Sequence, residues 1–207
     1  MPRRQGHAKQ DIVVNANVQL FIHDRKAVRG DPEHGLGDLD TILDSVRRYR
    51  DFEDPRRPRL TRKQQLELLH NHLRPRGIKD FDEGHNKAVT IGLTEIGNVW
   101  MNKTTNFPGW CSVGTDGTAP ADSDTQLISE VARKAISRSF QNGVISNLDT
   151  LFNENEGNGT LLEVGLHWAS SGNNNLYFRR NFPAPGKIKT TGDTMTNKWD
   201  ITWSSGT

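Results

Sequence analysis

The stretch Thr194–Trp203, TMTNKWDITW, decides the fold because its residues alternate between polar and apolar with a period of two. One phase is apolar apart from Asn197, and it consists of Met195, Trp199, Ile201 and Trp203. Successive side chains of a strand point to opposite faces of a sheet. The pattern therefore predicts a strand with one buried face and one solvated face.

Further strands are expected on the N-terminal side of this stretch. The turns between them, SSGNNN and NENEGNG, are rich in Gly, Asn and Ser. Short strands separated by such turns are typical of an antiparallel sandwich. The expected strands are Ile12–Asp24, Trp110–Thr115, Ala135–Phe140, Leu161–Trp168 and Leu176–Phe182.

Four helices are expected between these strands. A short apolar helix is predicted over Thr90–Asn102, and another from Ser123 to Val131, where Ser123 and Gln126 match a capping box. Two charged helices, one beginning at Asp38 and one at Thr61, are separated by a proline-containing segment and predict a helical hairpin. The expected fold class is thus α+β and mainly β: a C-terminal antiparallel β-sandwich with short helices, preceded by a charged helical hairpin region.

Charged residues are distributed unevenly along the 207-residue chain. Residues 1–86 carry 31 charged side chains, whereas residues 87–207 carry 21. The change in composition near Gly84–Asn86 favours a boundary there. We expect residues 1–85 to form an arm, a strand and the hairpin, and residues 86–207 to form the sandwich domain.

Cysteine content and hydrophobicity limit where the chain is expected to work. The single cysteine, Cys111, cannot form an intramolecular disulfide, which fits assembly in a reducing cytoplasm. No stretch approaches the roughly 18 apolar residues of a membrane span, and no apolar segment follows the basic start MPRRQGHAKQ. We expect a soluble protein without a membrane partner.

The sequence contains few residues in patterns that carry catalysis or bind metal. His70 and His72 are two residues apart, so on a helix they point to different faces. No HExxH, CxxC or GxSxG pattern is present, and Glu154 and Glu156 lie in a Gly/Asn-rich stretch. Cys111 is expected to be a small buried residue. We therefore expect no enzyme, no metal and no cofactor.

Two groups of residues are candidates for contacts with partners. The first is a basic run in a region of mixed charge, which favours docking to an acidic neighbour over binding to nucleic acid; it comprises Arg56, Arg57, Arg59, Arg62 and Lys63. The second is the set of tryptophans. Trp168, Trp199 and Trp203 fall in apolar strand phases and are expected in the core, whereas Trp110, beside Pro108 and Gly109, is the candidate exposed aromatic.

Three segments in a fixed order resemble a class of tailed-bacteriophage structural proteins. They are HNKAVTIGLTEIGNVW (85–100), WCSVGTDGTAPADSDTQLISEVAR (110–133) and the closing segment from Gly157 to Ser204, which contains EVGLHW and GDTMTNKWDITW. The early portion also resembles the N-terminal domain of tail-collar fibre proteins. Unlike a collar fibre, the given sequence does not continue into a shaft, and it carries the charged hairpin before the shared region.

The resemblance implies a structural protein of the virion, assembled in the host cytoplasm. An adaptor, collar or capsid-decoration protein is expected, which docks to other tail, neck or capsid proteins and forms homo-oligomers. Two alternatives remain open: a host-glycan-binding attachment module of the tail, and a nucleic-acid-associated packaging or head–tail completion component that uses Arg56–Lys63.

Overall fold

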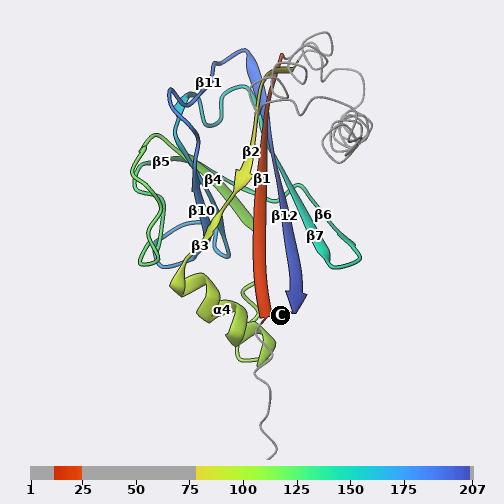
Figure 1. Ribbon diagram of the computed structural model, residues 1–207. Helices are drawn as coiled ribbons and strands as arrows, with labels where there is room; N and C mark the ends of the chain where they lie inside the picture. The colour runs from red at the N-terminus through yellow and green to blue at the C-terminus, as the bar shows by residue number, and fades with distance from the viewer. Residues whose placement is uncertain (1–11, 25–77, 206–207) are drawn as a thin grey trace, which may run out of the picture.

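A computed structural model describes residues 12–24 and 78–205 (Figure 1). Within these ranges the chain is mainly β with one helix, α4 (Thr90–Trp100), so the expected fold class is confirmed. The expected charged hairpin, including Arg56–Lys63, lies outside the described residues.

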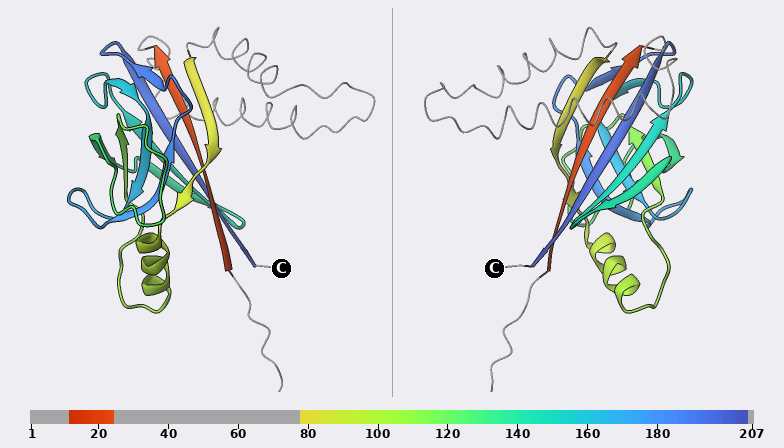
Figure 2. Two further views of the ribbon diagram at one scale, coloured as in Figure 1. Left: turned by 60° about the vertical axis from the view of Figure 1, so that its left-hand side comes forward. Right: turned by 90° about the vertical axis from the view of Figure 1, so that its right-hand side faces the viewer.

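The first sheet has five antiparallel strands in the order β2-β1-β12-β7-β6. At its centre β1 pairs with β12 along thirteen consecutive residues, from Ile12 opposite Ser205 to Asp24 opposite Asp193. The views in Figure 2 show these two long strands side by side. Its strands are β1 (Ile12–Asp24), β2 (Ile78–His85), β6 (Arg138–Asn142), β7 (Ile145–Phe152) and β12 (Asp193–Ser205).

The pairing of β1 with β12 crosses the boundary expected near Gly84–Asn86. Both β1 and β2 precede that boundary, yet they form one sheet with the C-terminal strand. The change in charge density therefore does not coincide with an edge of the β-structure. Residues on both sides of it contribute to the same sandwich.

The second sheet also has five antiparallel strands, in the order β3-β10-β9-β4-β5, and a small third sheet pairs β11 with β8. Two expected strands are divided: Ala135–Phe140 contains parts of β5 and β6, and Leu161–Trp168 contains parts of β8 and β9. The strands are β3 (Lys87–Ala88), β4 (Trp110–Gly114), β5 (Glu130–Ala135), β8 (Gly159–Leu161), β9 (Glu163–His167), β10 (Leu176–Asn181) and β11 (Lys187–Lys189).

The core lies between the two five-stranded sheets, and its centre is Trp199 of β12. The indole is fully buried and its ring lies 6.4 Å from that of Phe178 in the opposite sheet. Cys111 of β4 is also fully buried, and its sulfur accepts hydrogen bonds from Trp199 Nε1 and from Asn197 Nδ2, each at 3.4 Å. Burial raises the pKa of Cys111 to about 11, so the thiol stays neutral, and its expected role as a small buried residue is confirmed.

A buried ion pair also links the sheets. Arg180 of β10 lies 2.7 Å from Asp82 of β2, and both side chains are less than 10% exposed. A side chain on Gly84 would collide with the Arg180 guanidinium, because a Cβ there would lie 2.6 Å from Nη2. Glycine at this position leaves the space that the guanidinium occupies.

The polar face of β12 differs from the prediction. A solvated face was expected, but Thr194, Thr196 and Lys198 are 7%, 2% and 3% exposed. β12 is the middle strand of its sheet, with β1 hydrogen-bonded on one side and β7 on the other. Lys198 is opposite Asp149 in the register with β7, so the buried ammonium has a carboxylate across the strand pair.

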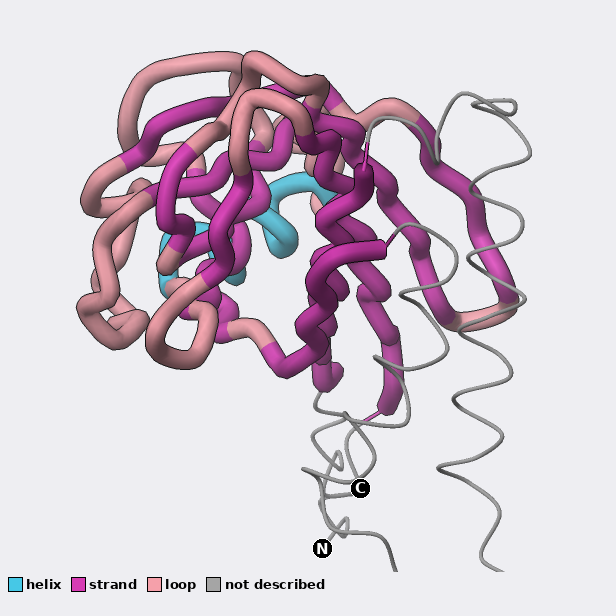
Figure 3. Tube along the Cα trace, turned by 90° about the horizontal axis from the view of Figure 1, so that it is seen from above, coloured by secondary structure: helices cyan, strands magenta, loops and turns pink. Residues whose placement is uncertain are grey.

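The helix expected from Ser123 to Val131 is absent, and that prediction is wrong. Residues 115–129 form turns and extended backbone that cover the outer face of the second sheet, and β5 begins at Glu130. Asp124 binds Arg179 of β10 instead of supporting a helix start, and Leu127 is buried. Figure 3, which looks along the long strands, shows the loops gathered on one side of the molecule.

Helix α4 confirms the helix expected at Thr90–Asn102, and it packs on β10 through Gly92. A Cβ at Gly92 would lie 2.5 Å from the carbonyl oxygen of Tyr177 and 2.6 Å from its Cα. Only glycine permits this approach of helix and strand. Gly97, one and a half turns later, has no neighbouring atom within 4 Å of the same hypothetical Cβ.

The two helix glycines should respond oppositely to alanine. Gly92→Ala forces the helix away from the Tyr177 backbone and should lower the free energy of unfolding by about 1–3 kcal/mol. Gly97→Ala, the matched control, meets open space and should raise it by about 0.5–1 kcal/mol, because alanine favours the helix. Urea unfolding followed by tryptophan fluorescence measures both. Equal effects of the two variants would contradict the packing of α4 described above.

Candidate functional site

A buried Ser–His–Asn arrangement lies on the outer face of the second sheet. Ser112 Oγ of β4 is 2.6 Å from His167 Nε2 of β9, and His167 Nδ1 is 2.8 Å from Asn175 Oδ1. This order of groups is that of a nucleophile, a base and an orienting residue in hydrolases. It is the strongest catalytic candidate among the described residues.

The hydrogen bonds of Asn175 determine the tautomer of the histidine. Its amide nitrogen donates to the carbonyl oxygens of Ser171 and Gly172, so its oxygen must accept from His167 Nδ1–H. Nε2 is therefore free to accept the hydroxyl proton of Ser112. Arg133 Nη1 also donates to Asn175 Oδ1, at 2.9 Å.

The surroundings of His167 oppose its use as a base. Burial, followed by the positive charge of Arg133, lowers the pKa of His167 to about 3, although hydrogen bonds with Asn175 act in the opposite direction. Glu130 Oε2 lies 4.0 Å from Nε2, but it is already held by the guanidinium of Arg133. A serine nucleophile requires an imidazole that can become positively charged, and this environment disfavours that charge.

Solvent and substrate are also kept from this arrangement. Ser112 and His167 are fully buried. A Cβ on Gly165 would lie 2.9 Å from both His167 Nε2 and Leu127 Cδ2, so the buried Leu127 packs near the imidazole. The site is closed by residues 115–129, and the Ser–His–Asn hydrogen bonds serve to satisfy buried polar atoms.

A second buried network attaches residues 115–129 to the sheet. The carboxylate of Glu163 accepts from the backbone N–H groups of Ile128 and Ser129, at 3.2 and 2.8 Å, and from Arg179 Nε at 2.9 Å. Arg179 also lies 2.7 Å from Asp124. Glu163 and Arg179 are both fully buried, so each charge depends on the other for stabilisation.

Removing one charged member of this network should lower the free energy of unfolding substantially. Glu163→Gln leaves Arg179 with one carboxylate fewer and should lower the free energy of unfolding by about 3–5 kcal/mol. Asp122→Asn, a change of the same kind in an exposed carboxylate that is paired with Lys87, is the control and should cost under about 1 kcal/mol. Urea unfolding measures both, and a loss below 1 kcal/mol for Glu163→Gln would contradict the role given to this pair.

Titration of His167 tests its closed environment. The folded chain should keep this imidazole neutral down to about pH 4, with the proton on Nδ1, because its pKa is about 3. Its unfolded counterpart takes up a proton near 6.5. Stability is therefore lost as the pH falls below about 6.5, by up to about 1.4 kcal/mol per pH unit from this group.

Nitrogen-15 NMR of the imidazole measures both the charge and the tautomer. Asn175→Asp is the informative variant, because a carboxylate next to Nδ1–H should raise the pKa of His167. A wild-type His167 that titrates near 6.5 would show that the imidazole is open to solvent, contrary to the structure.

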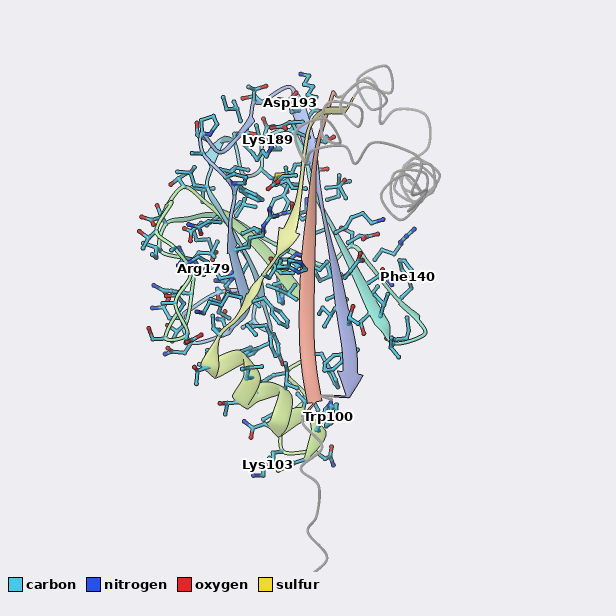
Figure 4. All side chains as sticks on the ribbon, in the orientation of Figure 1. Trp100, Lys103, Phe140, Arg179, Lys189 and Asp193 are labelled. Carbon is cyan, nitrogen blue, oxygen red and sulfur yellow. The ribbon has the colours of Figure 1, made fainter. Side chains whose placement is uncertain are left out.

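An exposed apolar surface lies at the C-terminal end of α4, next to the ends of β1 and β12. Trp100 is 59% exposed and stacks on Trp203, with ring centroids 6.2 Å apart. The backbone N–H of Trp203 donates to the carbonyl of Val144, which is 61% exposed. We call Leu93, Trp100, Met101, Val144 and Trp203 the aromatic end; Figure 4 shows Trp100 there, far from Lys189 and Asp193.

The exposed tryptophan is thus Trp100, and not Trp110. Trp110 is half-buried in β4, where it is paired with Ala135 and His167. Trp199 is fully buried and Trp168 and Trp203 pack against the core, as their strand phases predicted.

The opposite end of the sandwich is charged. Lys79 binds Asp193 and Lys187 binds Asp80, so two ion pairs connect the start of β2 with β11 and β12. Asp24, the last residue of β1, is opposite Asp193 in the register. Asp24 and Ile78, the described residues on either side of residues 25–77, thus both lie at this charged end. The candidate docking residues Arg56, Arg57, Arg59, Arg62 and Lys63 fall outside the described residues.

Within residues 12–24 and 78–205, no group of three or more His, Cys, Asp or Glu residues is arranged to hold a metal ion. None of the helical structure described there is long and apolar enough to cross a membrane. No family model matches the chain, and searches of curated proteins and of solved structures found no match.

Sequence reasoning missed Ser112, His167 and Asn175. Ser112 and His167 are 55 residues apart and lie on neighbouring strands, so only the register of β4 with β9 brings them together. A signal was present in EVGLHW, where Glu163 and His167 interrupt an otherwise apolar strand. A charged or polar residue in such a strand points to a buried network on its second face.

Proposed function

We propose that this chain is a non-enzymatic structural component of a tailed-phage virion. It would act as an adaptor, collar or decoration protein that docks to neighbouring proteins. The observation that carries the proposal is the exposure of apolar side chains at the aromatic end, combined with the resemblance of residues 84–205 to phage structural proteins.

The helix surface at the aromatic end is suited to a protein partner. Leu93, Trp100 and Met101 are 48%, 59% and 58% exposed. The one charged residue of α4, Glu95, is buried and accepts hydrogen bonds from Thr104 and Asn106. The exposed side chains of α4 are Leu93, Trp100 and the uncharged Thr90 and Thr94. The helix itself therefore presents no charge that a partner would have to desolvate.

The size of the aromatic end favours a contact within a larger assembly. Its exposed side chains amount to roughly 300–400 Å² of apolar surface, worth about 8 kcal/mol at about 25 cal/mol per Å² before the costs of association. A stable interface buries about 800 Å² on each partner. The aromatic end would thus form the centre of an interface to which other surfaces contribute.

The charged end supplies a second contact of different character. Asp24 and Ile78 lie there, and the basic run Arg56–Lys63 from the residues between them would dock to an acidic neighbour and set orientation. In this arrangement the aromatic end provides most of the binding free energy, and the charged end fixes the orientation of the partner. Partners would be other virion proteins or further copies of this chain.

One observation favours an alternative function. The stacked pair of Trp100 and Trp203 presents an exposed indole face, and aromatic side chains can present a flat apolar face together with a polar edge to a ligand. A host-glycan-binding module would use Trp100, because Trp110 is half-buried. The nucleic-acid alternative rests on Arg56–Lys63 alone.

Incorporation into particles tests the proposal. The wild-type chain should co-sediment with assembled virions, and Trp100→Asp should reduce its incorporation about tenfold or more, since a carboxylate would have to be buried in the interface. The matched control is Val131→Asp, which alters a side chain that is 44% exposed on β5 and belongs to neither the aromatic end nor the charged end. It should be incorporated normally.

The outcomes separate the functions. A monodisperse wild-type monomer that is absent from particles would contradict a structural role. If particles contain Trp100→Asp at the normal level but adsorb poorly to host envelopes, the glycan-binding alternative is supported instead.

A further inference from the structure

Lys189 is a buried lysine at the charged end whose Nζ donates three hydrogen bonds. Its side chain is among the largest that are completely buried, with 1% of the residue exposed. Nζ donates to the carbonyl oxygen of Asn153 at 2.9 Å, to that of Glu154 at 3.3 Å and to Asn158 Oδ1 at 2.7 Å. All three acceptors belong to residues 153–159, which run from the end of β7 to the first residue of β8.

The number of acceptors indicates the charged form of the amine. An ammonium group has three N–H donors, whereas a neutral amine has two. Burial lowers the pKa of Lys189, and the carboxylates of Asp193, Glu156 and Glu154 oppose that shift. Three acceptors and three nearby carboxylates together provide the surroundings of a bound cation.

The loop itself has the composition and geometry of a cation-binding loop. Its sequence, NENEGNG, is rich in the Asn and Glu oxygens and backbone carbonyls that bind hard cations. Gly157 and Gly159, on either side of Asn158, have φ values of +63° and +130°, which favour glycine over residues with a side chain. Asn158 Nδ2 donates to the Glu154 carbonyl at 2.9 Å, which holds the Asn158 oxygen toward Nζ.

The outer side of the loop is closed by a separate ion pair. Glu156 accepts from the ammonium of Lys134 in β5 and, at 2.7 Å, from the backbone N–H of Asn153. The loop therefore contacts β5 on one side and β11, through Lys189, on the other. Its shape depends on both lysines, but only Lys189 is enclosed by the carbonyls.

We infer that residues 153–159 form a monovalent-cation site whose occupant is the ammonium group of Lys189 in the same chain. A covalently attached cation organises this loop without any free metal ion. Two consequences follow. Folding of the charged end should be insensitive to chelators, and the site should accept free ammonium once the lysine side chain is removed.

The test uses the full chain and ammonium chloride as the probe. Lys189→Ala should lower the melting temperature by about 5 °C, because buried acceptors lose their donor. Ammonium chloride should restore part of that loss in a saturable way. Tetramethylammonium chloride at equal ionic strength should restore none, since that cation has no N–H donor and is too large for the cage.

Lys187→Ala is the matched control. It removes a lysine two residues away on β11 whose partner is Asp80 at a more exposed position. Its melting temperature should not respond specifically to ammonium, and neither should that of the wild type. A Lys189→Ala variant that folds but shows the same response to both salts would overturn the inference.

Two measurements on the wild type test the inference even if the Lys189→Ala variant fails to fold. Nitrogen-15 NMR should detect Lys189 as a slowly exchanging ammonium group, and a rapidly exchanging signal would overturn the inference. Intact-mass spectrometry should give the full mass of the chain. A mass short by one ammonia, together with a proteolytic fragment in which Lys189 is cross-linked to Asn158, would mean that Nζ has formed an amide with Asn158, and the ammonium site would then not exist.

Discussion

The thirteen-residue pairing of β1 with β12 is the constraint on which the rest of the structure depends. It places two segments from opposite parts of the chain at the centre of one sheet, with their backbone groups paired to each other and to β2 and β7. Because both strands are long and in continuous register, they also determine the two ends of the molecule. The termini of the ladder near Ile12 and Ser205 lie at the aromatic end, and Asp24 and Asp193 lie at the charged end.

Several buried charged side chains lie on the faces of the sheets that point away from the core. On the second sheet, Glu163 and Arg179 are completely buried beneath residues 115–129. Such pairs add little net stability compared with apolar residues, but breaking them is costly. Their effect here is to fix the position of a long loop, and the Ser–His–Asn hydrogen bonds beneath it complete the pairing of polar atoms. A geometry familiar from hydrolases thus has a structural explanation at this location.

Much of the β-structure could be predicted from local pattern. The alternation in Thr194–Trp203 predicted β12 and the burial of Trp199, and the apolar spacing of residues 90–102 predicted α4. Failures arose where tertiary contacts outweighed local preference. Ser123 and Gln126 match a capping box, but Asp124 and Leu127 find partners on the sheet, and the backbone of Ile128 and Ser129 binds Glu163 instead of helix carbonyls. The polar phase of β12 looked solvated because its burial depends on neighbouring strands that local sequence does not identify.

The candidate sites were harder to predict than the fold. Trp110 was predicted to be exposed because of its neighbours Pro108 and Gly109, yet strand pairing half-buries it. Trp100 is exposed instead, on a helix whose sequence is largely apolar. Lys189 gave no local signal, since its acceptors come from a loop more than thirty residues earlier. In each case the deciding contacts are distant in sequence.

Function is therefore proposed at surfaces and not in a pocket, and the aromatic end is the central surface. Hydroxyl-radical footprinting of Trp100 in the free chain and in assembled particles tests this most directly, with half-buried Trp168 as an internal reference. We predict that Trp100 is oxidised readily in the free chain, where it is 59% exposed, and is protected in particles, while the oxidation of Trp168 is unchanged. Equal oxidation of Trp100 in both states would contradict docking through this end.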